Sequence, residues 1–298
     1  MHIDWAGVFP AVTTQLHEDL TVDLRNTQRV VDELIRDGVN GIIALGTVGE
    51  NNSLEPAEKL AVLAAVVEVV NGRVPVLTGV SEYDTRRAIR YTQAAEKAGA
   101  DGLMLLPPMV YVPKRHELIA HFAGVARATA LPIMLYNNPP AYRTMIDAQT
   151  LLELAPLENI VALKESAPDP RRFTDVYNAV GDRYVLFAGL DDVALEGLFL
   201  GARGWVSGLT NAFPQESVGL VAALRAGDHA KAVAIYRWFM PLLHLDAEHD
   251  LVQSIKLAEQ IMGRGSERVL PPRMTLIGER RAEVTAMVEK AAATRPVL

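Results

Sequence analysis

Eight short apolar runs recur along the chain with helical patterns between them, and this alternation restricts the possible folds more than any other feature. Each run is rich in Val, Ile and Leu and is bounded by Gly, Pro or Asn, as buried strands of parallel sheets usually are. Between the runs, stretches such as residues 24–38 place apolar residues at helical spacing and end at a glycine. The predicted strands cover residues 7–13, 41–45, 74–80, 102–106, 131–137, 160–165, 184–189 and 204–208.

This alternation predicts a (β/α)₈ TIM barrel over residues 1–226. The strand pattern stops after residue 226, and residues 227–298 are predicted to form a C-terminal helical extension. A doubly wound open sheet is the alternative, but the first strand lacks the Gly-x-Gly-x-x-Gly turn that would favour it. In barrels of this kind the active site lies at the C-terminal ends of the strands.

Charge and composition exclude several classes of function. The formal net charge is −7, which argues against binding to the phosphate backbone of nucleic acids. The chain has no cysteine, so disulfides and thiolate ligands are excluded and a cytoplasmic location is expected. No apolar stretch reaches the roughly 18 residues needed to span a bilayer. We therefore expect neither a membrane nor a nucleic acid as a partner.

Lys164 is the one lysine of seven that ends a predicted strand, whereas the other six fall in predicted helices or their first turns. Strand alternation places Lys164 on the same face as Ala162, whose small side chain leaves room for the long lysine stem. Burial would lower the pKa of the amine and yield a neutral nucleophile that condenses with a carbonyl carbon. The structural alternative is a lysine that extends from the strand end into solvent.

Tyr136 ends the preceding predicted strand and therefore lies beside Lys164 in a sequentially ordered barrel. A phenol at this position could move protons to and from the carbinolamine formed at the lysine. The alternative is a tyrosine that caps the barrel core with its hydroxyl in water. The shared position of the two residues at neighbouring strand ends favours the catalytic interpretation.

Three segments resemble the dihydrodipicolinate synthase / N-acetylneuraminate lyase superfamily: GTVGENNSLEPAEK (46–59), LYNNP (135–139) and ALKES (162–166). The resemblance extends from about residue 5 to about residue 290 with the same spacing between motifs. Members are (β/α)₈ enzymes that form a Schiff base with pyruvate or other 2-oxo acids. The resemblance therefore implies the same fold and chemistry here, with no metal or organic cofactor.

By this resemblance Lys164 matches the imine-forming lysine and Tyr136 matches the proton-relaying tyrosine. Thr47 matches a hydroxyl residue of the Gly-Thr-Thr-Gly-Glu motif, and the backbone amides of Thr47 and Val48 match those that hold the substrate carboxylate. Val48 itself departs from the motif, which has threonine there in dihydrodipicolinate synthase. Further predicted substrate-binding residues are Asn138, Gly189 and Val206.

Two other departures concern the second substrate of dihydrodipicolinate synthase. That enzyme has a pair of tyrosines after the fourth strand, where an ungapped comparison places Met109 and Val110, with Tyr111 one position later. Its carboxylate-binding arginine after the fifth strand corresponds to Ala141, with Arg143 two positions on. These changes preserve the imine chemistry and argue against condensation with aspartate semialdehyde. Contacts of Tyr111 or Arg143 with substrate remain open.

Four stretches resemble the branch of the superfamily that deaminates 1-pyrroline-4-hydroxy-2-carboxylate in bacterial hydroxyproline breakdown. They are FPAVTTQ (9–15), GTVGEN (46–51), YNNP (136–139) and YRWFMPLLHLD (236–246). The alternatives are 4-hydroxy-tetrahydrodipicolinate synthase and aldolases or dehydratases of 2-keto-3-deoxy sugar acids. A non-enzymatic barrel that senses a 2-oxo acid is a further hypothesis, although a binding protein has no need of an imine.

The remaining expectations concern assembly and two acidic stretches. Members of the superfamily are usually tetramers or dimers, and the apolar run at 238–245 is expected to supply contact surface for a homotetramer or homodimer. The acidic pair at 191–192 is predicted to cap a helix N-terminus. The stretch HLDAEHD (244–250) is predicted to be a solvated turn, because its spacing fits no zinc pattern.

Overall fold

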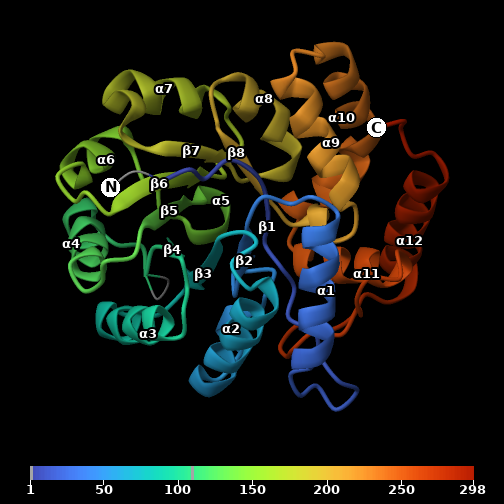
Figure 1. Ribbon diagram of the computed structural model, residues 1–298, viewed down its shortest axis with the longest axis horizontal. Helices are drawn as coiled ribbons and strands as arrows, with labels where there is room; N and C mark the ends of the chain where they lie inside the picture. The colour runs from blue at the N-terminus through green and yellow to red at the C-terminus, as the bar shows by residue number, and fades with distance from the viewer. Residues whose placement is uncertain (1–2, 109–110) are drawn as a thin grey trace.

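The computed structural model describes residues 3–108 and 111–298 (Figure 1). Its centre is a sheet of eight parallel strands in the order β1-β8-β7-β6-β5-β4-β3-β2. Neighbours in this order are also consecutive in sequence, apart from β1 and β8. The strands are β1 (Gly7–Pro10), β2 (Ile42–Ala44), β3 (Val76–Val80), β4 (Gly102–Leu105), β5 (Ile133–Asn137), β6 (Ile160–Glu165), β7 (Val185–Ala188) and β8 (Gly204–Ser207).

The sheet closes on itself. Strand β1 pairs with β8 through the register Gly7↔Gly204 to Pro10↔Ser207. On its other side, β1 is joined to β2 by the parallel bridge Ala11↔Ile43. The strand order has no reversal of the kind that creates the ligand crevice of an open doubly wound sheet. The prediction of a (β/α)₈ barrel with a C-terminal helical extension is therefore confirmed.

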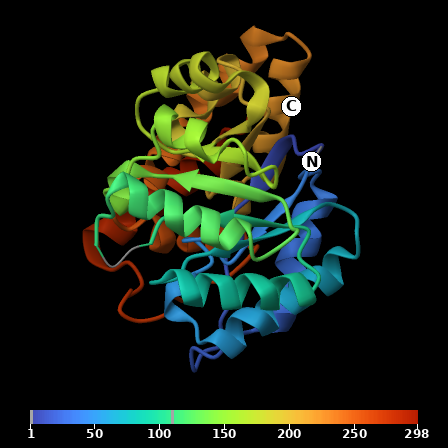
Figure 2. The same ribbon diagram turned by 90° about the vertical axis from the view of Figure 1, so that its left-hand side faces the viewer.

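Helices surround the barrel, and the last helices gather on one side of it (Figures 1 and 2). Their N-termini are fixed by local side chains, as at α1, where Asp23 accepts a hydrogen bond from the Asn26 amide. The helices around the barrel are α1 (Leu24–Arg36), α2 (Pro56–Val70), α3 (Thr85–Lys97), α4 (Arg115–Ala126), α5 (Pro139–Tyr142), α6 (Ala148–Leu154), α7 (Arg171–Val180), α8 (Ala194–Phe199) and α9 (Pro214–Arg225).

The barrel interior is filled by side chains. The rings of Phe9 and Phe187 meet edge to face with centroids 5.1 Å apart. Gly41, just before β2, and Gly204, the first residue of β8, make room for them, because a Cβ at Gly41 would lie 2.2 Å from Phe9 and one at Gly204 would lie 2.3 Å from Phe187. The large rings thus occupy the interior near the N-terminal ends of the strands, and ligand space is left at the opposite ends.

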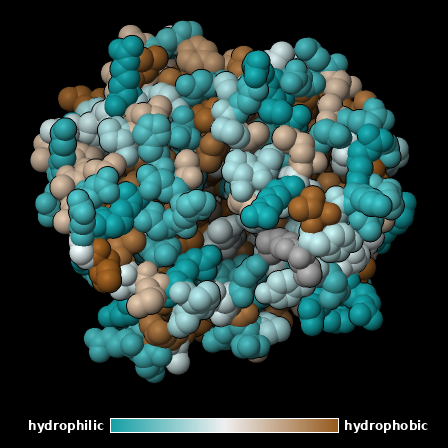
Figure 3. Space-filling view, turned by 180° about the vertical axis from the view of Figure 1, so that it is seen from behind, coloured by the Kyte–Doolittle hydropathy of each residue, from teal (hydrophilic) through white to brown (hydrophobic). Residues whose placement is uncertain are grey.

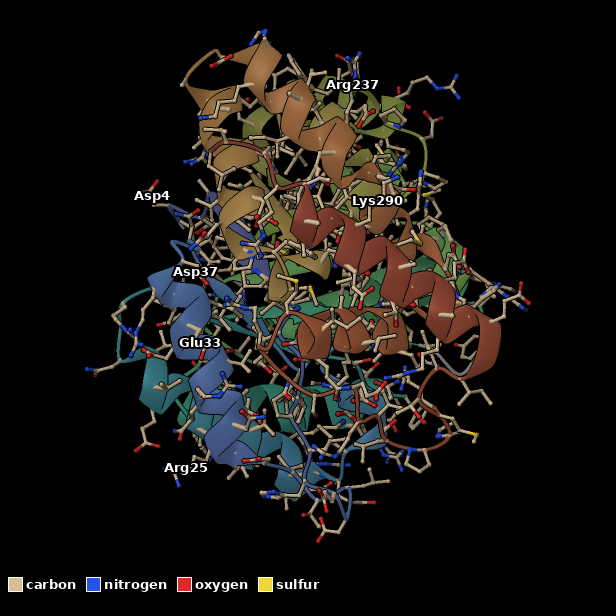
Figure 4. The ribbon with its side chains drawn as sticks, turned by 90° about the vertical axis from the view of Figure 1, so that its right-hand side faces the viewer. Asp4, Arg25, Glu33, Asp37, Arg237 and Lys290 are labelled. Carbon is tan, nitrogen blue, oxygen red and sulfur yellow. The ribbon has the colours of Figure 1, made fainter. Side chains whose placement is uncertain are left out.

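The extension consists of α10 (His229–Leu243), α11 (Leu251–Ile261) and α12 (Gly278–Ala293). Helix α11 lies between α1, on which Arg25 and Glu33 are labelled, and α12, on which Lys290 is labelled (Figures 1 and 4). The division of the chain at residue 226 stays a prediction.

A fully buried ion pair joins the extension to the barrel. Lys256, on α11, donates hydrogen bonds to the Thr14 carbonyl at 2.9 Å and to Glu50 Oε2 at 2.7 Å. Thr14 follows β1 and Glu50 follows β2, so one side chain links the loops after the first two strands. Glu50 adopts a left-handed conformation with φ of 56°, which this interaction supports.

Candidate active site

Lys164 lies near the C-terminal end of β6, a strand in which every residue is buried. Its register partner on β5 is Tyr136. The ammonium Nζ lies 4.0 Å from the centroid of the Tyr136 ring. Burial lowers the pKa of Lys164 below its ordinary value, while the nearby carboxyl group of Asp246 opposes this shift. The lysine is thus held inside the barrel mouth, and the solvent-exposed alternative is wrong.

Gly189 provides the space that the lysine stem occupies. A Cβ at this position would lie 2.6 Å from Lys164 Cγ, 2.8 Å from Lys164 Cε and 2.2 Å from Ser166 Oγ. Such distances are shorter than nonbonded carbon atoms tolerate. The residue after β7 must therefore be glycine if Lys164 is to keep this conformation.

We expect Gly189→Ala to destabilise the protein and to impair the lysine. Overpacking of this kind costs about 1–3 kcal/mol in folding free energy, and here the side chain that must move is Lys164 itself. Denaturant unfolding and borohydride trapping of a 2-oxo acid would measure both effects. Gly124→Ala, on α4 and away from the pocket, is the control. Trapping at the wild-type rate in Gly189→Ala would show that the lysine does not depend on this space.

Tyr136 is buried beside the lysine with its hydroxyl held in place. Asn138 Nδ2 donates a hydrogen bond to the Tyr136 hydroxyl at 2.9 Å. Burial raises the pKa of Tyr136 to about 12, so the phenol is protonated at neutral pH. Asn138 also accepts a hydrogen bond from the Ala141 amide and begins the short helix α5. Asn138 therefore orients the phenol and the helix that follows it.

Tyr142, at the end of α5, is a site residue that the sequence interpretation missed. Its hydroxyl lies 2.7 Å from Thr47 Oγ1. Its ring packs edge to face against Tyr136 with centroids 5.6 Å apart. Burial raises the pKa of Tyr142, so this phenol is also protonated. Thr47, Tyr142 and Tyr136 thus form one cluster of hydroxyl groups beside Lys164.

The turn after β2 presents two backbone amides toward the same space. Neither the Thr47 nor the Val48 N–H donates a hydrogen bond to another residue in the described part of the chain. The turn is held from below by Asn51, whose amide group donates to the carbonyls of Leu45 at 2.9 Å and Gly79 at 3.0 Å. Two unpaired N–H groups in a rigid turn suit a carboxylate.

Lys164, the two tyrosines and the Thr47–Val48 turn line one pocket. The space open to the centres of water molecules is about 40 Å³, enough for a few waters and therefore matched to a small ligand. Val206 is buried in β8 outside this lining, and Gly208, two residues later, lines the pocket in its place. The lining residues are Ala11, Thr47, Val48, Met104, Tyr136, Asn138, Ala141, Tyr142, Lys164, Gly189, Gly208, Asp246 and Leu251.

Asp246 reaches this pocket from the 3-10 helix η5 (His244–Ala247), and the predicted solvated turn is wrong at this residue. Leu245 beside it is 1% exposed and anchors the segment in the core. Burial raises the pKa of Asp246 to about 6, and the charge of Lys164 opposes the rise. The prediction failed because the many charged residues of this stretch indicate a solvated turn, although Leu245 is buried and Asp246 lines the pocket.

Asp191 likewise differs from its predicted role as a helix cap. It is fully buried and accepts hydrogen bonds from Trp205 Nε1 at 2.8 Å, Ser207 Oγ at 3.1 Å and the Leu209 amide at 3.0 Å. These donors come from β8 and the turn after it. Asp191 therefore fixes the end of β8 beneath the pocket.

Tyr111 and Arg143 do not line the pocket in the described residues. Tyr111 is 57% exposed. Arg143 ends α5 in a left-handed conformation with φ of 54° and is exposed. Met109 and Val110 lie outside the described residues.

A closed parallel barrel with a buried lysine, two phenols and two open amides at the strand ends defines a (β/α)₈-barrel enzyme. The model of the Dihydrodipicolinate synthetase family matches residues 4–291. The chain belongs to this family, as its motifs predicted.

Known relatives match over almost the whole length. The chain is 32% identical to 4-hydroxy-tetrahydrodipicolinate synthase 2 of Halalkalibacterium halodurans, over 97% of this chain and 99% of the relative. It is 33% identical to an uncharacterized DapA-like lyase of Rhizobium meliloti, over 95% and 96%. The crystal structure of YagE from E. coli K12 in complex with pyruvate matches with a TM-score of 0.92 and 30% identity, over 97% and 99%.

The described residues contain neither a membrane-spanning helix nor a cluster of metal ligands. None of the helices in residues 3–108 and 111–298 combines the length and apolar character needed to cross a membrane. Within the same residues, His, Asp and Glu side chains form no group of three or more that could hold a metal ion.

Proposed function

We propose that the protein is a Schiff-base enzyme that deaminates 1-pyrroline-4-hydroxy-2-carboxylate to 2-oxoglutarate semialdehyde and ammonia. The observation that carries the Schiff-base chemistry is the buried Lys164 amine, whose Nζ lies 4.0 Å from the centroid of the Tyr136 ring in the pocket that the Thr47 turn also lines. The YagE relative, which binds pyruvate, supports a 2-oxo acid or its cyclic imine as the ligand.

The first stage exchanges one imine for another. The amides of Thr47 and Val48 hold the substrate carboxylate, and neutral Lys164 attacks C2 of the ring imine. A proton reaches the ring nitrogen, the C2–N bond breaks, and the ring opens. The substrate is then bound to Lys164 as a protonated imine, and its own nitrogen is a free amine on C5.

The second stage removes water and ammonia. The protonated imine draws electrons from C3, which loses a proton through Tyr136. The electron pair forms a C3–C4 double bond, and the C4 hydroxyl leaves as water. Tautomerisation converts the C5 amine into an imine, which water hydrolyses to an aldehyde and ammonia. Hydrolysis at Lys164 then releases 2-oxoglutarate semialdehyde, so the overall reaction consumes one water.

The cluster of hydroxyls provides a route for these protons. Tyr136 packs against Tyr142, and the Tyr142 hydroxyl lies 2.7 Å from Thr47 Oγ1. All three residues belong to one chain and line the pocket. The relay that we propose therefore needs no tyrosine at positions 109 or 110.

A second candidate is 4-hydroxy-tetrahydrodipicolinate synthase, which the name of the Halalkalibacterium relative favours. Its second substrate carries a carboxylate, for which an arginine is the usual partner. No arginine is among the described residues that line the pocket, and Ala141 lines it where the arginine was expected. This lining favours a reaction without a second carbonyl substrate.

The deciding experiment is an assay of the purified protein on three substrate sets. These are the hydroxylated pyrroline, pyruvate with aspartate semialdehyde, and a 2-keto-3-deoxy sugar acid. We expect ammonia release from the pyrroline and little turnover of the other two. Efficient turnover of either other set, with none of the pyrroline, would assign the protein to that branch while leaving the lysine chemistry in place.

We also propose that the protein assembles as a homotetramer or homodimer. The run at 238–245 is not the contact surface we expected, since Phe239, Leu242, Leu243 and Leu245 are buried within the chain itself. Exposed apolar side chains elsewhere include Tyr111, Val112, Met274 and Ile277, although the face in Figure 3 shows apolar residues scattered among hydrophilic ones. Light scattering tests this, and a fully active monomer would contradict it.

A further inference from the structure

Asp246 is placed in the pocket by the extension rather than by a barrel strand. It lies in η5, between the buried Leu245 and the start of α11. Gly208 leaves the room for its carboxylate, because a Cβ there would lie 2.8 Å from Asp246 Oδ1. The chain thus builds a specific position for a carboxylate at the β8 side of the pocket.

The Asp246 carboxylate has little to bind within the described protein. Within residues 3–108 and 111–298, its one hydrogen bond comes from the Asp191 amide at 3.4 Å, a long and weak contact. Neighbouring Asp192 is paired instead with His244 Nδ1 at 2.8 Å. Asp191 uses its own oxygens on Trp205, Ser207 and Leu209. Asp246 is therefore the carboxylate that remains open toward the pocket.

Lys164 is the basic group whose charge acts on Asp246, and no ion pair within 4.0 Å joins the two among the described residues. Both side chains line the pocket. Once Lys164 forms a protonated imine with a ligand, its nitrogen keeps one positive charge but only one N–H, whereas an ammonium group on the ligand would bring three. A carboxylate in this partly buried position is then stabilised by a cation on the ligand itself.

We propose that Asp246 binds an ammonium group at the far end of a 2-oxo acid held as an imine on Lys164. The open amides of Thr47 and Val48 hold the carboxylate end, Lys164 holds C2, and Asp246 stands on the β8 side. Asp246 thereby selects ligands with an amine on C5. This inference rests on the imine chemistry of the proposed function and identifies the residue that recognises the ring-opened intermediate.

The test uses ligands that form the imine but cannot eliminate water. 1-Pyrroline-2-carboxylate lacks the C4 hydroxyl and opens on Lys164 to a chain with a C5 ammonium. 2-Oxopentanoate has the same carbon chain with an uncharged end, and pyruvate lacks the chain. Calorimetric titration of the full-length protein gives the Kd of each ligand without reductant.

We expect the wild-type protein to bind the pyrroline more tightly than 2-oxopentanoate. Asp246→Asn should weaken pyrroline binding by about 10- to 100-fold, as expected for loss of a partly buried charge pair. It should change the Kd of pyruvate and 2-oxopentanoate little. Glu248→Gln is the matched control, because this exposed carboxylate two residues on pairs with Arg280 outside the pocket.

Several results would overturn the inference. These are equal wild-type affinity for the two five-carbon ligands, an Asp246→Asn variant that keeps the preference, and an equal loss for all three ligands. The wild-type comparison needs no variant, so a variant that fails to fold does not remove the test. Failure of the proposed function is distinct: the wild-type protein would then prefer the pyrroline yet release no ammonia from its hydroxylated form. If pyruvate itself does not bind as an imine, both proposals fail together.

Discussion

Lys164→Ala is expected to abolish imine formation and to lower turnover by roughly 10⁴- to 10⁶-fold, the scale on which removal of a catalytic nucleophile acts. No other lysine lines the pocket in the described residues, so none can take its place. Borohydride treatment with a 2-oxo acid should add the reduced ligand mass to the peptide that contains Lys164. The same peptide from Lys164→Ala should remain unmodified.

Lys97→Ala provides the matched control, since Lys97 is exposed in the last turn of α3. It removes one lysine at the surface and should leave trapping and turnover unchanged. Normal turnover in Lys164→Ala would refute the Schiff-base mechanism, whatever the substrate.

Tyr136→Phe should lower kcat by about 10²-fold or more, the usual scale for loss of a general acid–base group. The ring that packs against Lys164 and Tyr142 is retained, so ligand binding should suffer less than kcat. Single-turnover kinetics separate the imine-forming step from the later steps. Tyr142→Phe removes the next hydroxyl of the cluster and should give a smaller loss if protons pass from Tyr136 toward Thr47.

An unchanged kcat in Tyr136→Phe would return this residue to a packing role. If both variants instead show a raised KM and a lowered kcat, each changed by the same factor in the two variants, the two tyrosines act by shaping the pocket. The fold of each variant is checked by its affinity for pyruvate, which depends on the same lysine.

The fold was predictable because the alternation of apolar runs and helical patterns covers the whole chain. All eight predicted strands are present, most of them shorter than predicted at one or both ends. The proximity of Lys164 and Tyr136 was also predictable, because in a sequentially ordered barrel neighbouring strands in sequence are neighbours in space. Their direct register pairing confirms this reasoning.

Two site residues that escaped prediction, Tyr142 and Asp246, come from outside the strands. Tyr142 reaches the pocket through a single turn of helix begun by Asn138, and no strand periodicity marks it. Asp246 lies in a charge-rich stretch whose pattern is that of a solvated turn. In both cases the direction of the side chain depends on loop geometry and on the packing of one neighbouring residue.

Two predictions based on apolar or acidic composition were wrong for a related reason. The apolar run at 238–245 was expected to supply contact surface between subunits, but Phe239, Leu242, Leu243 and Leu245 are buried within the chain itself. Asp191 does begin a helix, the 3-10 helix η3 (Asp191–Val193), but its carboxylate accepts hydrogen bonds from β8 instead of capping that helix. Composition indicates that a residue is buried or paired without identifying the partner, which depends on the tertiary fold.

The hydrogen bonds of Lys256 affect how the protein folds while it is being synthesised. Among the described residues, β1 and β2 meet at one isolated bridge, and the buried Lys256 side chain ties together the loops that follow them. A ribosome reaches Lys256 only after it has translated all eight strands. A nascent chain that ends before this residue therefore carries all eight strands but lacks the side chain that holds the loops after β1 and β2 together. It should remain open to proteases and chaperones there until the last helices emerge.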